Sequence, residues 1–127
     1  MTLRIDTCTI DARDPAVLAG FWSEALGWRV RTDSDGDVWV ESREDDGSRG
    51  STPLLFVSDP EAKSVKNRIH LDLRPDDQAA EVERLQRLGA RQADIGQSGS
   101  QSWVVMADPE GNEFCVLSSR PTGPMTG

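Results

Sequence analysis

The chain has 127 residues, of which 36% are hydrophobic and 28% charged, so it can form one substantial core but is short for two ordinary domains. Its 22 acidic and 14 basic residues give a net charge of −8, which repels phosphate backbones and anionic lipids and argues against a nucleic-acid or membrane partner. Because no apolar run is long enough to span a membrane and the first residues lack an export signal, we expect a cytoplasmic protein.

The first half of the chain predicts a strand, a helix and three further strands. Residues 3–12 predict a strand, in which Cys8, Ile10 and Ala12 alternate with Thr7, Thr9 and Asp11. A helix follows, with Asp14 as its cap, Pro15 in its first turn and Gly27 at its end. The remaining strand candidates of this half are residues 28–32, 37–42 and 53–57.

The second half repeats this order. Residues 67–75 read as a strand, and a helix follows at 76–90, capped by Asp77 and ended by Gly89. The turn "PEG" at 109–111 separates the last two strands. The strand candidates after the helix are residues 91–95, 102–108 and 112–119.

Two βαβββ units therefore make up one predicted domain over residues 1–120. Unit one covers 1–58, a linker 59–66 and unit two 67–118, while the tail at 119–127 is expected to be disordered. Helices can cover only one side of each sheet. The prediction is an α+β fold in which the units pair into a curled mixed sheet that encloses a cavity, with the helices outside.

The only histidine, His70, lies in "RIHLDL" at residues 68–73. Strict alternation predicts a strand in which Ile69, Leu71 and Leu73 face the core. His70 could then be an acid or base, a hydrogen-bonding anchor for a ligand, or a pocket histidine satisfied by a neighbour. The face opposite to the core carries Arg68, His70 and Asp72.

Three segments carry a resemblance to a known family: "FWSEALGW" at 21–28, "RIHLDLRPDDQAAEVERLQRLGA" at 68–90 and "ADPEGNEFCVL" at 107–117. With the βαβββ duplication, they resemble the glyoxalase-like branch of the vicinal oxygen chelate superfamily. That superfamily includes glyoxalase I, extradiol dioxygenases, fosfomycin-resistance enzymes and bleomycin-binding proteins. The resemblance covers roughly residues 3–118 and implies the fold, but it does not choose among these functions.

The resemblance also implies where a metal would be held, because metal-dependent members take ligands from the first and last strand of each unit. Only His70 is a residue type usual at these positions, although a thiolate at Cys115 could bind a soft metal. We therefore expect no metal and no cofactor, with a divalent metal held by His70, Cys115 and Glu113 as the alternative. The four positions implied by the resemblance are Thr7, Leu55 or Phe56, His70 and Cys115.

Other chemistry is conceivable on the same strands. Cys115 and His70 should project to one face as a thiol and imidazole pair, with Arg68 able to stabilise a thiolate. Alternatively, His70 acts as a lone acid or base beside Asp72. Glu113 shares the face of Cys115, so the candidate catalytic residues are His70, Glu113 and Cys115. The competing readings are a buried, inert cysteine and a solvated glutamate.

Aromatic residues supply candidate walls for a cavity. Trp22 and Trp28 are expected in the core, whereas Trp39 and Trp103 occupy equivalent third strands of the two units and could stack on a planar or sugar-like ligand. Core packing is an equally good account of either. The predicted ligand-binding residues are Thr7, Trp39, Phe56, His70, Asp72 and Trp103.

Two functions follow from these observations. The first is a protein that binds a small organic ligand without a complete metal site, in a sequestering or resistance role, and the acidic charge suits a cationic ligand. The alternative is a glyoxalase-like lyase or isomerase that uses His70 with Glu113 or Cys115, with or without a divalent metal. The resemblance also implies a homodimer.

Overall fold

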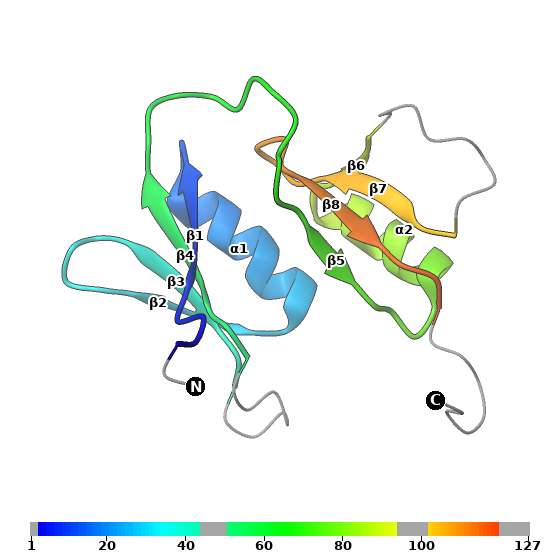
Figure 1. The fold of residues 1–127 in the computed structure, drawn as a ribbon, viewed down its shortest axis with the longest axis horizontal. Coiled ribbons are helices and arrows are strands. Elements are labelled where there is room, and N and C mark those ends of the chain that lie inside the picture. The colour runs from blue at the N-terminus through cyan, green and yellow to red at the C-terminus, as the bar shows by residue number, and fades with distance from the viewer. Residues whose placement is uncertain (1–2, 44–50, 94–101, 120–127) are drawn as a thin grey trace. The chain divides into compact units, whose positions relative to one another are not determined.

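The computed structural model describes residues 3–43, 51–93 and 102–119, and the chain divides into two compact units, Met1–Lys63 and Ser64–Gly127 (Figure 1). The division falls inside the predicted linker at 59–66. The predicted tail at 119–127 lies outside the described residues, apart from Ser119.

Unit one contains one helix and a four-stranded mixed sheet. The sheet order is β1-β4-β3-β2, in which β1 runs parallel to β4 and the other neighbours are antiparallel. This unit has the predicted order of elements. Its elements are β1 (Cys8–Ala12), α1 (Pro15–Leu26), β2 (Arg29–Thr32), β3 (Val38–Glu41) and β4 (Leu54–Ser58).

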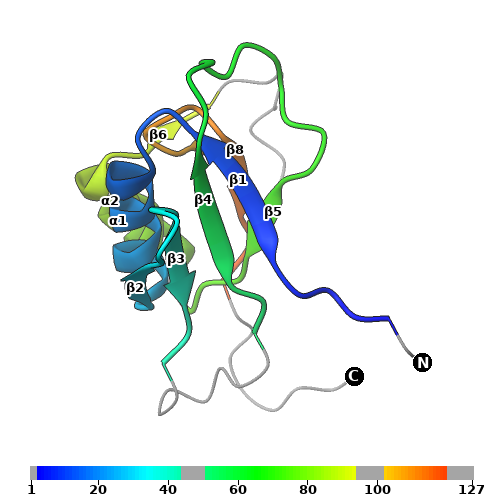
Figure 2. The ribbon, with the colours of Figure 1, turned by 90° about the vertical axis from the view of Figure 1, so that its left-hand side faces the viewer.

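Helix α1 begins and ends where the sequence predicts. The carboxylate of Asp14 accepts a hydrogen bond from the amide of Val17 at 3.2 Å, and Pro15 begins the helix. Gly27 ends it with a φ of 70°, a conformation that costs glycine little. The helix covers one face of the sheet (Figure 2). Its buried residues are Leu18, Ala19, Phe21 and Trp22.

Unit two repeats the architecture, with sheet order β5-β8-β7-β6 and β5 parallel to β8. Asp77 caps its helix by accepting from the amide of Ala80 at 3.1 Å, and Gly89 ends it. The two halves are thus built alike, which confirms the α+β fold. The elements are β5 (Leu71–Leu73), α2 (Gln78–Leu88), β6 (Arg91–Gln92), β7 (Val104–Ala107) and β8 (Glu113–Val116).

The first strand of unit two is much shorter than the predicted strand at 67–75. Among the described strands, β5 pairs only with β8, and this ladder begins at Leu71 opposite Phe114. Residues 67–70, just before Leu71, belong to no strand, and the backbone bends at Arg68 and Ile69. Ile69 is 83% exposed, and the prediction that it faces the core is wrong.

The "ADPEGNEF" segment forms a tight turn between β7 and β8. The carboxylate of Asp108, only 1% exposed, accepts from the amides of Glu110 at 3.0 Å and Asn112 at 2.9 Å. Gly111 takes a φ of 90° within the turn. The "DSDGD" turn between β2 and β3 uses the same pattern, because Asp33 accepts from the amides of residues 35 and 37.

Helices α1 and α2 have 12 and 11 residues. Within the described part of the chain, neither combines the length and apolar content needed to cross a bilayer.

Candidate functional site

The face of the unit-one sheet that points away from α1 carries polar and partly exposed side chains. In β3, Val38 and Val40 are buried, whereas Trp39 and Glu41 are half-buried. Side chains alternate along strands and match across register pairs, so the other strands can be assigned from the pairings. We call this surface the distal face of unit one. It comprises Thr9, Asp11, Arg29, Arg31, Trp39, Glu41, Leu55 and Val57.

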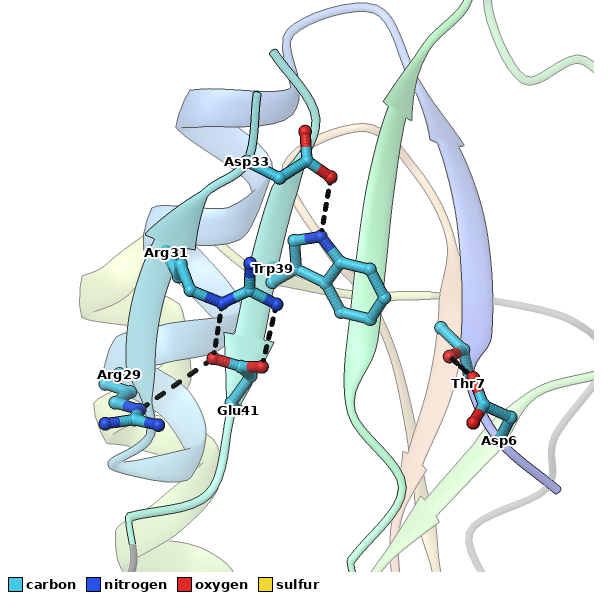
Figure 3. A network of polar contacts seen from close by, with 7 residues as sticks. All are labelled: Asp6, Thr7, Arg29, Arg31, Asp33, Trp39 and Glu41. Atoms are coloured by element: carbon cyan, nitrogen blue, oxygen red, sulfur yellow. Dashed lines mark hydrogen bonds and ion pairs between the residues drawn. The ribbon is translucent and has the colours of Figure 1, made fainter. Parts of the chain in front are cut away.

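Trp39 is the centre of a polar network on this face (Figure 3). Its indole Nε1–H donates to Asp33 Oδ2 at 2.9 Å, and the Arg31 guanidinium carbon lies 5.0 Å from the ring centroid. Arg31 in turn donates to both oxygens of Glu41, at 3.1 and 3.0 Å. The ring is therefore held by a hydrogen bond on its edge and a cation on one side.

The network shifts the proton affinities of its members. The hydrogen bonds from Arg31 hold the pKa of Glu41 below its ordinary value and raise the pKa of Arg31. The indole hydrogen bond from Trp39 lowers the pKa of Asp33, and the amides of residues 37 and 35 add to this effect. Both carboxylates are therefore charged at neutral pH.

Thr7 lies one residue before β1, as His70 lies one residue before β5. Its hydroxyl donates to Asp6 Oδ2 at 2.6 Å. Within the strand it is Thr9 that pairs with Leu55.

Phe56 does not lie on the distal face of unit one. It is fully buried, and its register partners Val38 and Ile10 place it on the side covered by α1. The residue at the expected position is Leu55, which pairs with Thr9 as Cys115 pairs with Asp72. A shift of one residue along a strand moves a side chain to the other face. The sequence alone does not decide whether Leu55 or Phe56 takes the site-facing position.

In unit two, the equivalent face brings together three side chains that can bind metals or transfer protons. Asp72 and Cys115 are register partners on β5 and β8, and His70 lies two residues before Asp72. His70 Nε2 lies 3.3 Å from Asp72 Oδ1, and one donor atom from each of the three side chains lies within 4.8 Å of the others. We call His70, Asp72 and Cys115 the unit-two triad.

The triad is open on one side and buried on the other. The side chains of His70 and Asp72 are 41% and 52% exposed, while Cys115 is 8% exposed. Burial raises the pKa of the Cys115 thiol, and the charge of Asp72 and a hydrogen bond to it raise the pKa further. At neutral pH Cys115 is therefore a thiol, which argues against its use as a nucleophile.

Two further residues bear on the predicted site, Glu113 and the cation near Cys115. Glu113 lies on the same face as Cys115, but its Oε1 accepts from the backbone amide of Asn67 at 2.9 Å. The cation that lowers the pKa of Cys115 is Lys66, whereas the sequence suggested Arg68. Lys66 has no sequence signal, because it lies in the segment that precedes β5.

Trp103 and Trp39 do not occupy equivalent strand positions. Trp103 precedes β7 and is 41% exposed, whereas the register equivalent of Trp39 in unit two is Val105, which pairs with Cys115. Among the described strands, the only aromatic side chain that is partly exposed is therefore Trp39 of unit one, because Phe56 and Phe114 are buried.

A second group of possible metal ligands in the described residues is Asp33, Asp35 and Asp37. The Asp33 carboxylate is already engaged, because it accepts hydrogen bonds from two turn amides and from the Trp39 indole. Two of these three hydrogen bonds close the β2–β3 turn.

Comparisons with solved structures find the same fold. An enzyme of the glyoxalase/bleomycin resistance protein/dioxygenase family from Burkholderia phytofirmans PsJN is 16% identical, with a TM-score of 0.70 over 93% of this chain and 100% of that chain. The fosfomycin resistance protein FosX from Mesorhizobium loti is 15% identical, with a TM-score of 0.68 over 96% of both chains. The bleomycin-binding protein of Streptomyces verticillus is 17% identical, with a TM-score of 0.58 over 94% of this chain and 99% of that chain.

No curated protein sequence matches this chain. The family model of the glyoxalase-like domain matches residues 7–117, which is nearly the whole chain. The repeated units, the two capped helices and the Asp108 turn all lie within this match. The chain therefore belongs to the glyoxalase-like domain family, within the vicinal oxygen chelate superfamily.

Proposed function

We propose that this protein binds a small organic ligand, that Trp39 supplies the surface on which the ligand stacks, and that binding needs no metal. In the cell, this binding would serve to sequester the ligand or to give resistance to it.

The observation that carries the proposal is the fixed orientation of a half-buried tryptophan. The Trp39 ring is held by Asp33 and Arg31, and it lies beside its register partner Leu55, which is also half-buried. An aromatic ring that is already immobilised loses little conformational entropy when a ligand stacks on it. A purely structural tryptophan in the core would be fully buried, as Trp22 is.

The ligand class follows from charge. The chain carries a net charge of −8, which raises the local concentration of cations and opposes anions. Support by analogy for the binding of a small organic ligand, but not for its charge, comes from the similar structures, which include a bleomycin-binding protein and a fosfomycin resistance protein. We favour a planar organic cation.

The test is a thermal-shift screen of chelator-treated protein, followed by calorimetric titration. The probes are metal-free bleomycin, fosfomycin and a panel of planar organic cations. A cationic probe should raise the melting temperature, and Trp39→Leu should weaken its binding about two- to twelvefold, since one aromatic stack contributes about 0.5 to 1.5 kcal/mol beyond its buried area. Val17→Ala, on the exposed side of α1, is the control.

Two results count against the proposal. Either no probe stabilises the protein, or Trp39→Leu binds the stabilising probe as tightly as the wild type.

A homodimer stays a prediction, which light scattering of the protein during size-exclusion chromatography tests.

A second candidate is a lyase or isomerase that transfers a proton through His70. The exposure of His70 and its contact with Asp72 favour this reading, because a base needs access to its substrate and a partner that orients it. Conversion of a probe by the wild type, lost in His70→Ala and retained in Trp39→Leu, would favour the enzyme over the binding protein.

A further inference from the structure

We infer that unit two binds one soft divalent metal ion, of which Zn²⁺ is the model, through His70 Nε2, a carboxylate oxygen of Asp72 and Cys115 Sγ. This inference goes beyond the proposed function and does not depend on it, because every ligand lies in unit two and Trp39 has no part.

The backbone places the three ligands together before any metal binds. Parallel pairing of β5 with β8 sets Asp72 beside Cys115, and the His70 side chain reaches the same place, with Nε2 3.3 Å from Asp72 Oδ1. The hydrogen bond from the amide of Asn67 to Glu113 ties the segment before β5 to β8. The approach to His70 is therefore anchored on both sides, by Glu113 before it and by the ladder after it.

The separations suit a tetrahedral ion. Ligand distances of about 2.0 Å for nitrogen and oxygen and about 2.3 Å for sulfur place tetrahedral ligand atoms about 3.3 to 3.6 Å apart. His70 Nε2 and Asp72 Oδ1 are already 3.3 Å apart, and the donor atoms of the triad all lie within 4.8 Å of one another. Small rotations of the side chains can bring the remaining donor atoms to these separations, and the exposed side of the triad leaves a fourth position for water.

This site differs from the ligand set that the family resemblance implies. Thr7 and Leu55 hold the corresponding positions in unit one, and neither is a usual metal ligand. Asp72 is outside that set, and it supplies the third ligand from within unit two. Soft and borderline ions are favoured, because a thiolate and an imidazole are two of the three donors.

Binding is a simple exchange of a proton for a metal. The Sγ–H bond of Cys115 breaks, its proton passes to solvent and a sulfur–metal bond forms, with no change in oxidation state.

The experiment titrates the full-length, untagged protein with Co²⁺ and then with Zn²⁺. A Co²⁺–thiolate bond gives a charge-transfer absorption in the near ultraviolet, so the wild type should develop this band to one equivalent per chain, and Zn²⁺ should remove it. Mass spectrometry under native conditions should show one Zn²⁺ per chain. These measurements use the wild type and need no variant to fold.

Variants then assign the ligands. Cys115→Ser should abolish the charge-transfer band, whereas Cys8→Ser, which changes the other free cysteine, should retain it. His70→Ala and Asp72→Asn should each weaken Zn²⁺ binding by more than about tenfold, since loss of even an outer-shell partner costs about 10- to 100-fold. Both side chains are substantially exposed, so these two changes leave the core intact.

Three results would overturn the inference: no charge-transfer band in the wild type, an undiminished band in Cys115→Ser, or unchanged Zn²⁺ affinity in both His70→Ala and Asp72→Asn. Asp35→Asn tests the other acidic group and should have no effect. Trp39→Leu separates the two proposals, because it should lose the organic ligand and keep the metal.

Discussion

Trp39 and Asp33 are joined by a hydrogen bond that also ties the β2–β3 turn to the strand that follows it. The indole Nε1–H donates to Asp33 Oδ2 at 2.9 Å, while Asp33 Oδ1 accepts from the amides of residues 35 and 37. One carboxylate therefore closes the turn and orients the ring. Because its two oxygens have separate tasks, a single substitution can remove one task and keep the other.

Asp33→Asn should release the indole and preserve the turn. The remaining Asn oxygen can accept the turn amides, but its NH₂ group cannot accept the indole proton. We expect the Trp39 indole N–H to exchange with solvent faster, while the far-ultraviolet circular dichroism stays unchanged. The measurement is the ¹⁵N–¹H spectrum, in which Trp39→Phe identifies the resonance. An indole exchange rate equal to that of the wild type would show that packing alone orients the ring.

The ion pair of Glu41 should make the protein less stable as the pH falls. Hydrogen bonds from Arg31 lower its pKa in the folded protein, so the ionised form is favoured by folding. The stabilisation is full above the ordinary glutamate pKa of about 4.3 and is lost as the pH falls through the lower folded value. Exposed ion pairs contribute about 1 kcal/mol or less.

Urea unfolding from pH 7 to pH 3 tests this expectation. Glu41→Gln should be less stable than the wild type by up to about 1 kcal/mol at pH 7, and the difference should shrink as the pH drops below about 4. Arg31→Lys keeps the charge but loses the paired hydrogen bonds, so it should retain part of the effect. A difference that grows as the pH falls would contradict the assignment.

Asp108 should be among the residues most sensitive to substitution. Its buried carboxylate accepts from two backbone amides and from the side-chain amide of Asn112, at 3.2 and 3.0 Å. Asp108→Ala should reduce the free energy of unfolding by about 2 to 4 kcal/mol, because it leaves these donors without their acceptor. Asp35→Ala, at an exposed position of the β2–β3 turn, should change it by less than about 0.5 kcal/mol. Equal losses in the two variants would contradict this account.

Much of the fold could be predicted because its signals are local. Asp14 and Gly27 mark the ends of α1 in the sequence, and Asp77 and Gly89 mark those of α2, as the cap geometry confirms. Turn chemistry is equally local, so the turn that follows Asp108 could be predicted from the residues "PEG" at 109–111. These features depend on residues within a few positions of one another.

The candidate site was harder to predict because it depends on register. Alternation made Ile69 look like a core residue, but strand pairing stops at Leu71 and leaves Ile69 in solvent. The sequence also narrowed the first-unit position only to Leu55 or Phe56, which face opposite ways. Asp72 was predicted as a ligand-binding residue, yet its place beside Cys115 required the pairing of strands that lie far apart in the sequence.

Leu55 and Phe56 give a direct test of this register. Phe56 is fully buried beneath α1, so Phe56→Ala should cost about 3 to 5 kcal/mol of unfolding free energy. Leu55 is half-buried on the distal face of unit one, so Leu55→Ala should cost clearly less, by about 2 kcal/mol or more. Chemical denaturation of both variants measures the difference. The opposite order would mean that β4 has the reverse orientation, and then Leu55 could not lie beside Trp39 where the proposed ligand stacks.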